Sequence, residues 1–229
     1  MKVSAVIPAA GRGSRMGTEK NKQFLTLRGL PILARTIKKF QQAKVVDEII
    51  IVAHKDEIDY CQQAVVEKYK LDKVTQIVAG GNTRQESVYN GLCEVGGEVD
   101  YVLVHDGARP LLEIELIEEL VEEVKQFKAA IVGVPIKDTI KKVNQNQIIE
   151  KTPDRSSLAA VQTPQAFERQ LILDAYYCAQ KEEIEGTDSS SLVEEMGEEV
   201  RLVCGSYENL KITTPEDLEF ADKILEMRS

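Results

Sequence analysis

The sequence predicts an α/β fold with a Rossmann-like, twisted and mostly parallel sheet that is flanked by helices. Three observations support this prediction. Short apolar runs alternate with amphipathic segments, a glycine-rich loop follows the first run directly, and the pattern breaks after Pro135 into an extended ribbon. Alternating strands and helices are typical of a parallel sheet that is covered on both faces.

The predicted strands are short runs rich in Val and Ile, at residues 3–7, 48–53, 74–79, 101–105 and 129–135. Runs of this kind indicate strands that are buried on both faces. The predicted helices place apolar residues at steps of three and four, at residues 31–43, 56–69, 84–95, 113–127 and 167–182. A last helix should begin at Thr214-Pro215-Glu216-Asp217, which combines a capping threonine, a first-turn proline and acids.

Residues 136–163 differ from the rest, because short extended stretches flank a polar turn at Asn144-Gln145-Asn146-Gln147. An isolated two-stranded hairpin is only marginally stable in water. We therefore expect a second copy of the chain to cover this ribbon, which makes it the arm of a homodimer. The sequence shows no internal repeat or linker, and residues 1–229 are interpreted as one domain that includes the arm.

Composition excludes several classes of function. A formal net charge of −9 argues against a nucleic-acid or membrane-surface partner, so an anionic ligand must be bound by local basic clusters. The chain has no run of ~20 apolar residues, and its first apolar run is too short for a signal peptide. The four cysteines and two histidines lack the spacing of a zinc site, so we expect reduced thiols and a cytoplasmic protein.

The loop after the first strand is the most informative segment, Pro8-Ala9-Ala10-Gly11-Arg12-Gly13-Ser14-Arg15-Met16-Gly17. It falls at the carboxyl edge of the sheet, where open α/β folds bind ligands. Glycines let backbone amides approach phosphate oxygens, and Arg12, Arg15, Lys20 and Lys22 supply cations. The loop therefore predicts a polyphosphate site.

Two common nucleotide motifs do not fit this loop. A dinucleotide-binding fingerprint would need a third glycine where Met16 stands and an acid near Leu30-Pro31, which argues against a nicotinamide-dependent oxidoreductase. A P-loop would need Gly-Lys followed by Ser or Thr, where the chain has Arg15-Met16-Gly17-Thr18.

The pattern A-A-G-x-G-x-R-M with Lys22-Gln23-Phe24 resembles the sugar-nucleotide transferase superfamily, and in particular the 2-C-methyl-D-erythritol 4-phosphate cytidylyltransferases. Further stretches resemble this family in the same order along the chain: Gly80-Gly81-Asn82-Thr83-Arg84-Gln85-Glu86-Ser87-Val88, Val104-His105-Asp106-Gly107-Ala108-Arg109-Pro110, Asp138-Thr139, Asp154-Arg155, Thr163-Pro164-Gln165, Thr187-Asp188 and the run from Asn209 to Leu218.

The resemblance implies transfer of CMP from CTP to a small sugar-alcohol phosphate. A phosphate monoester with a second pKa near ~6 is already dianionic at neutral pH and needs no general base. Catalysis then rests on positioning two anions and neutralising charge, with a divalent cation, Mg²⁺, as cofactor.

By resemblance, Arg15, Lys22 and Lys211 would act on the phosphates in the transition state. The CTP contacts implied are Ala9, Ala10, Gly11 and Gly13 at the triphosphate and Gly81, Asn82 and Ser87 at the cytosine. Asn82 stands where the family often has Asp, although a backbone contact would survive that change. Asp106, Arg109 and Thr187 would bind the acceptor from one subunit, with Thr139, Arg155 and Thr163 supplied by the partner's arm.

The predicted metal carboxylates are Asp106 and Glu208, the latter standing where the family usually has Asp. His105 is interpreted as a packing or supporting residue. Ser189 replaces an acid that the family usually has after Thr-Asp, which leaves Thr187 unaffected.

Two alternatives stay open from the sequence. A cytidylyltransferase for ribitol 5-phosphate would differ only at the acceptor pocket. A catalytically silent nucleotide-binding regulator could retain the fold, although such a protein would be expected to lose Lys22, Arg15 or Asp106.

Overall fold

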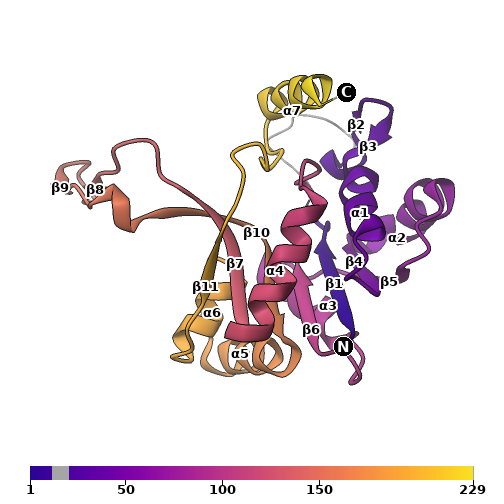
Figure 1. The fold of residues 1–229 in the computed structure, drawn as a ribbon, viewed down its shortest axis with the longest axis horizontal. Coiled ribbons are helices and arrows are strands. Elements are labelled where there is room, and N and C mark those ends of the chain that lie inside the picture. Colours follow the sequence, from indigo (N-terminus) through magenta and orange to yellow (C-terminus); the bar gives the residue numbers. More distant parts are fainter. Residues whose placement is uncertain (12–20, 229) are drawn as a thin grey trace.

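The computed structural model describes residues 1–11 and 21–228. Its centre is a seven-stranded sheet with the strand order β11-β7-β10-β6-β1-β4-β5 (Figure 1). The strands are β1 (Val3–Pro8), β4 (Glu48–Ala53), β5 (Val74–Ala79), β6 (Tyr101–Val104), β7 (Ala129–Pro135), β10 (Ala159–Glu168) and β11 (Arg201–Cys204). All neighbouring pairs are parallel except those that β10 makes with β6 and β7. The predicted mostly parallel α/β sheet is therefore confirmed.

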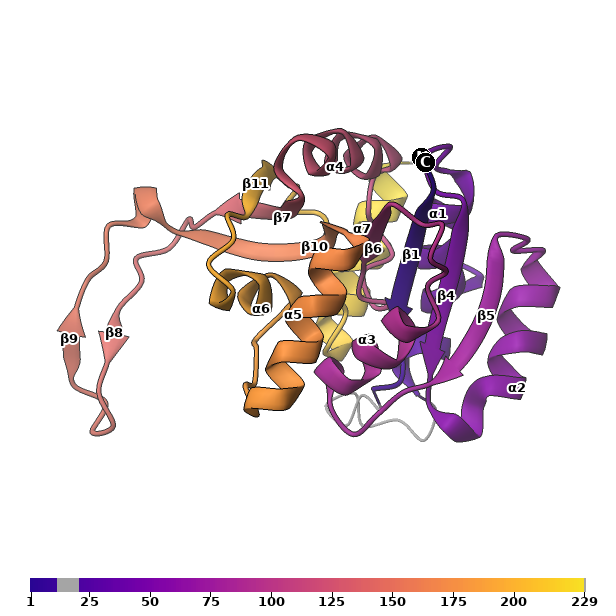
Figure 2. The same cartoon turned by 90° about the horizontal axis from the view of Figure 1, so that it is seen from below.

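Helices cover both faces of the sheet (Figure 2). One face carries α1 (Ile32–Gln42), α2 (Ile58–Cys61) with the π-helical turn Gln62–Glu67, and α4 (Ile114–Phe127). The other face carries α3 (Arg84–Cys93), α5 (Arg169–Glu182) and α6 (Ser189–Glu195). Alternate residues of β1 enter the two cores, Ile7 on the first face and Val6 on the second, because successive side chains of a strand point to opposite faces.

A third, smaller core lies at the carboxyl edge of the sheet. There α7 (Pro215–Met227) packs near the short hairpin β2 (Thr26–Leu27) and β3 (Leu30–Pro31), around Leu27, Ile32 and Ile212. Thr214 caps the N-terminus of α7, as the sequence predicts, and the structure shows that Asp217 completes a reciprocal capping box with it. This packing holds the C-terminal helix at the carboxyl edge of the sheet, whereas the N-terminus lies at the opposite edge (Figure 1).

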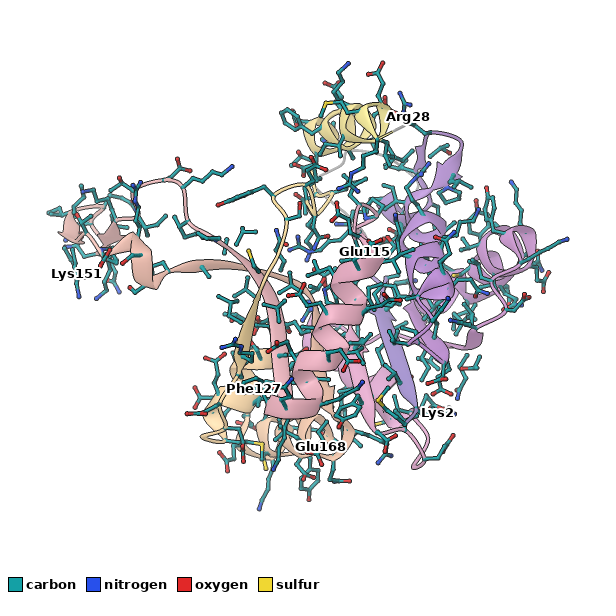
Figure 3. The ribbon with its side chains drawn as sticks, in the orientation of Figure 1. Lys2, Arg28, Glu115, Phe127, Lys151 and Glu168 are labelled. Carbon is teal, nitrogen blue, oxygen red and sulfur yellow. The ribbon has the colours of Figure 1, made fainter. Side chains whose placement is uncertain are left out.

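The arm is shorter than predicted. It leaves β7, forms the hairpin β8 (Lys142–Val143) and β9 (Ile149–Lys151) with a 3₁₀ turn at Arg155–Ser157, and returns as β10. Residues 159–163, assigned to the ribbon from sequence, belong to the sheet, where β10 lies between β6 and β7. Side chains project from both strands of the hairpin into solvent, with Lys151 at the end of β9, opposite Lys142 and away from the turn (Figure 3).

Other element boundaries also differ from the sequence prediction. The helix predicted at residues 167–182 begins at Arg169, because Phe167 and Glu168 complete β10. The predicted helix at residues 56–69 is divided into a 3₁₀ turn, α2 and the π-helical turn. Within the described part of the chain, no helix is both long and apolar enough to cross a membrane.

Gly91 allows α3 to approach the sheet closely. A Cβ atom at this position would lie 2.6 Å from Val6 Cγ1 and 2.7 Å from Val52 Cγ2. We predict that Gly91→Ala lowers the free energy of unfolding by about 1–2 kcal/mol, because overpacking exceeds the gain in helix propensity. Urea denaturation would measure this, with Gly97→Ala as the control, since its Cβ would meet open space. Equal stability of Gly91→Ala and wild type would contradict this packing.

Candidate active site

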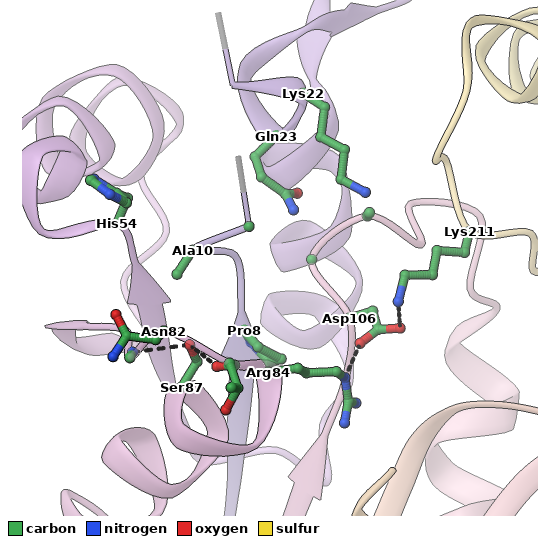
Figure 4. Close-up of a pocket in the computed structure, with 15 residues that line it drawn as sticks. Pro8, Ala10, Lys22, Gln23, His54, Asn82, Arg84, Ser87, Asp106 and Lys211 are labelled. Atoms are coloured by element: carbon green, nitrogen blue, oxygen red, sulfur yellow. Dashed lines mark hydrogen bonds and ion pairs between the residues drawn. The ribbon is translucent and has the colours of Figure 1, made fainter. Parts of the chain in front are cut away.

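A cavity of about 520 Å³ lies at the carboxyl edge of the sheet, a size suited to a small ligand. Four strands, β1, β4, β5 and β6, end beside it, and the residues that follow them form its walls (Figure 4). The lining residues are Pro8, Ala10, Gly11, Lys22, Gln23, His54, Gly81, Asn82, Thr83, Arg84, Ser87, Asp106, Gly107, Ala108 and Lys211. Eight of them were predicted site residues: Ala10, Gly11, Lys22, Gly81, Asn82, Ser87, Asp106 and Lys211.

The start of α3 forms one side of the cavity. Ser87 Oγ donates a hydrogen bond to the Thr83 carbonyl over 2.8 Å and accepts one from the Gly81 amide over 3.1 Å. Glu86 Oε2 accepts a hydrogen bond from the Asn82 amide over 2.7 Å. Side chains in the first turn of α3 therefore hold the loop that precedes the helix. The structure thus assembles Gly81, Asn82 and Ser87, with Ala10 packed near Gly80.

Two lysines from distant parts of the chain meet on the opposite side. Lys22 is buried in a 3₁₀ turn that Asn21 caps, and its Nζ donates to the Ile212 carbonyl over 3.1 Å. Lys211, the residue before Ile212, directs its Nζ towards Asp106 (Figure 4). Both lysines, for which the sequence predicts a role at the phosphates, therefore line the same cavity.

Asp106 is buried, and cations engage both of its carboxylate oxygens. Arg84 Nε lies 3.1 Å from Oδ1, Lys211 Nζ lies 2.8 Å from Oδ2, and Arg109 Nε lies 3.7 Å from Oδ2. Burial alone would raise the pKa of this carboxyl, but the positive charges of Arg84, Lys211 and Arg109 outweigh it and hold the pKa well below its ordinary value. The cluster carries a net positive charge, which suits phosphate.

Thr163 lies in β10, beside Asp106 of the same chain. Its Oγ1 accepts a hydrogen bond from the Asp106 backbone amide over 3.0 Å, and its side chain is buried. The expectation that the partner's arm supplies Thr163 is thus wrong, because this residue is part of the central sheet.

The other predicted residues fall outside the cavity lining. Ala9 is buried behind it, while Arg109 reaches Asp106 and donates from Nη1 to the Asn209 carbonyl over 2.7 Å. Thr187 is exposed before α6. Thr139 and Arg155 are exposed on the arm, away from the cavity of their own chain. Gly13 and Arg15, with Arg12 and Lys20, lie outside the described residues.

The two predicted metal carboxylates are not brought together. Glu208 binds Arg228 over 2.6 Å and is absent from the cavity lining, whereas Asp106 is surrounded by cations. Within residues 1–11 and 21–228, no group of three or more His, Cys, Asp or Glu side chains could hold a metal ion. The described residues therefore do not form a metal site by themselves.

Sequence reasoning gave no site role to the other seven lining residues, which are Pro8, Gln23, His54, Thr83, Arg84, Gly107 and Ala108. Arg84 is the most informative, because it pairs with Asp106 from the first turn of α3. The signal was available, since Arg84 stands within the Gly80–Val88 stretch and at a helix start beside the ligand-binding edge.

Comparisons with known proteins agree along almost the whole chain. The sequence model of the IspD family, 2-C-methyl-D-erythritol 4-phosphate cytidylyltransferase, matches residues 3–227. Proteins of that name from Clostridium acetobutylicum and Caldanaerobacter subterraneus are 51% and 49% identical, each over 225 residues. These alignments cover 98% of this chain and 98% and 99% of the two relatives. The crystal structure of 4-diphosphocytidyl-2C-methyl-D-erythritol synthase from Anaerococcus prevotii superposes with a TM-score of 0.87 at 35% identity, covering 98% of both chains.

The Arg84–Asp106 pair gives a prediction about charge. Replacing Arg84 with Gln should raise the pKa of Asp106 and lower the free energy of unfolding by about 1–2 kcal/mol, because two cations remain to compensate the buried carboxylate. Carboxyl ¹³C NMR titration and urea denaturation would measure the two effects. Arg28→Gln is the matched control, since Arg28 Nε contacts Asp222 at the same 3.1 Å but on the surface, where a pair contributes little. An equal decrease in the free energy of unfolding for Arg84→Gln and Arg28→Gln would contradict the prediction.

Proposed function

Because the chain belongs to the family of 2-C-methyl-D-erythritol 4-phosphate cytidylyltransferases, we propose that it transfers CMP from CTP to 2-C-methyl-D-erythritol 4-phosphate and releases pyrophosphate. The products are 4-diphosphocytidyl-2-C-methyl-D-erythritol and pyrophosphate, in a step of isoprenoid synthesis. The observation that carries the proposal is one cavity with a helix-start subsite on one side and Lys22, Lys211 and the Asp106 cluster on the other.

The reaction forms one phosphorus–oxygen bond and breaks another. An oxygen of the acceptor phosphate attacks the α-phosphorus of CTP, and the bond from this phosphorus to the bridging oxygen of pyrophosphate breaks. The attacking phosphate is dianionic near neutral pH, so no side chain must remove a proton. The task of the protein is to align two anions and to neutralise their charge.

We propose that two lysines of the cavity serve that task. Lys22 is buried, which strengthens its interaction with phosphate, and its Nζ lies against the backbone beside Lys211. Lys211 is more than a third exposed, so an entering phosphate can reach its ammonium group. Gly81, Asn82 and Ser87 offer a small polar subsite for the base, and Asp106 with Arg109 is proposed to bind the acceptor hydroxyls.

We propose that a divalent cation, Mg²⁺, takes part and depends on the phosphates of CTP for its binding. Asp106 is the carboxylate that lines the described cavity, and it is already ion-paired. Mg²⁺ prefers few carboxylates together with substrate phosphates, and when bound it neutralises developing charge on phosphate oxygens.

We also propose a homodimer through the arm. The arm exposes Ile140, Val143, Ile148 and Ile149, and the two strands of its hairpin are too short to be stable alone. Pairing would bury these side chains and could bring Thr139 and Arg155 to the partner's cavity, where a guanidinium fits the acceptor phosphate. A cytoplasmic location is in keeping with four cysteines that form no disulfide.

The proposed activity predicts a large effect of Lys22→Ala. We expect pyrophosphate release from CTP, Mg²⁺ and 2-C-methyl-D-erythritol 4-phosphate to fall at least ~10²-fold, because a buried cation that stabilises transition-state charge is lost. A coupled pyrophosphate assay measures this, with the exposed Lys223→Ala as control. Preference of wild type for ribitol 5-phosphate would instead assign that acceptor, and CTP binding without turnover would indicate a silent nucleotide-binding protein.

The proposed dimer leads to a second prediction, which concerns an exposed apolar residue of the arm. Ile149→Asp should shift the protein to a monomer in analytical ultracentrifugation, because it puts a charge into the proposed apolar interface. We expect kcat/KM for the acceptor to fall ~10-fold or more while CTP binding is retained. Phe220→Asp, which changes an exposed apolar residue on α7, should remain dimeric. A fully active monomer would rule out both the interface and the cross-subunit role of Arg155.

A further inference from the structure

A buried imidazole lies directly behind the acceptor side of the site. His105 follows β6 and is fully buried, with its ring against Phe40 at a centroid distance of 5.0 Å. Its Nε2 lies 3.1 Å from the Arg109 carbonyl oxygen, and its Nδ1 lies 3.1 Å from Thr163 Oγ1. Both ring nitrogens therefore contact groups that border residues proposed to bind the acceptor.

The chemistry of these partners fixes the direction of each hydrogen bond. A carbonyl oxygen only accepts, so Nε2 carries the proton and donates to Arg109. Burial lowers the pKa of His105 to about 4, so the ring is neutral at pH 7; Nδ1 then has a lone pair, and the Thr163 hydroxyl donates to it. The same hydroxyl accepts from the Asp106 amide over 3.0 Å, which completes the arrangement without an unsatisfied group on the ring or the hydroxyl.

These bonds hold both ends of one short segment. The segment from His105 to Arg109 carries two proposed acceptor contacts, Asp106 near its start and Arg109 at its end. The imidazole fixes the Arg109 end directly and the Asp106 end through Thr163. Asn209 contacts both residues that His105 holds. Its Nδ2 donates to the Thr163 backbone carbonyl over 2.9 Å, and its own backbone carbonyl accepts from Arg109 Nη1 over 2.7 Å.

We propose that His105 is a positioning residue for the acceptor, holding Asp106 and Arg109 in reactive geometry by hydrogen bonds to Thr163 and to the Arg109 backbone. The inference rests on the proposed function. His105 does not line the cavity, so it acts through its neighbours rather than on the substrates. A small misplacement of binding groups can lower a rate by ~10²-fold, which makes such a role measurable.

The two ring nitrogens can be separated by substitution. His105→Gln places an amide near the Nε2 position and can retain the bond to Arg109, while His105→Asn places a carbonyl near Nδ1 and can retain the bond from Thr163. His105→Leu removes both. Thr163→Ser keeps the hydroxyl that Thr163→Val removes. Ile117→Val, which shortens a buried side chain of α4, is the control for a general loss of packing.

The experiment measures kcat and KM for 2-C-methyl-D-erythritol 4-phosphate, and the Kd of CTP by calorimetry without acceptor, in the full-length protein. We expect kcat/KM for the acceptor to fall ~30- to 100-fold in His105→Leu, with smaller losses in the Gln and Asn variants. The Kd of CTP should change less than about threefold, and Thr163→Ser should recover most of the activity that Thr163→Val loses. Ile117→Val should match wild type in all these quantities.

Two results would overturn the inference while leaving the proposed function intact. One is an unchanged kcat/KM for the acceptor in His105→Leu, and the other is an equal loss in acceptor turnover and CTP binding. If His105→Leu fails to fold, as judged by circular dichroism, the same comparison of kcat/KM for the acceptor with the Kd of CTP is made in His105→Gln and His105→Asn. If wild type itself releases no pyrophosphate with this acceptor, the proposed function fails and the inference fails with it.

Discussion

The burial of the Asp106 carboxylate is the interaction on which the site depends, because a charge away from water must be compensated. Arg84 from α3, Arg109 from the segment after β6 and Lys211 from the C-terminal region supply that compensation. Removing a buried charge from its partners is costly, so these elements are held at fixed positions relative to one another. One carboxylate thus joins parts of the chain that lie far apart in sequence.

The same interaction explains how an acidic protein can bind anions. The chain carries a net charge of −9, yet the cavity gathers Lys22, Arg84 and Lys211 around a single compensated acid. Local charge within a partly enclosed cavity acts on a ligand more strongly than distant surface charge, which water and salt screen. An acidic overall charge, which argues against a nucleic-acid partner, is therefore compatible with a nucleotide substrate.

The elements predicted well from sequence are those whose burial leaves a pattern. The strands at residues 48–53 and 129–135 match the structure because both of their faces are buried and most of their residues are apolar. The strand at residues 74–79 also matches, although it is an edge strand whose residues are exposed or half-buried. β10 was missed because Gln162, Thr163 and Gln165 are polar but buried, satisfied by partners distant in sequence such as Asn209 and Asp188. In the site, motif residues gave most of the cavity lining. Contacts that depend on tertiary geometry, such as Arg84 with Asp106 and Glu208 with Arg228, could not be read from spacing.

β10 also links the site to the arm. Its first residues pair with the end of β7 at the base of the arm, and its later residues pair with β6 beside Asp106. Thr163 lies between these two regions, where the register with β7 shifts. Residues 165–167 of β10 are paired on both sides, whereas residues 159–161 are paired with β7 alone. The direction in which the arm leaves the sheet is therefore set by β7 and by the same strand that supports Asp106. In the proposed dimer, this connection would let an arm with little packing of its own deliver Thr139 and Arg155 to a defined place, since the sheet fixes the base of the arm and the partner covers the rest.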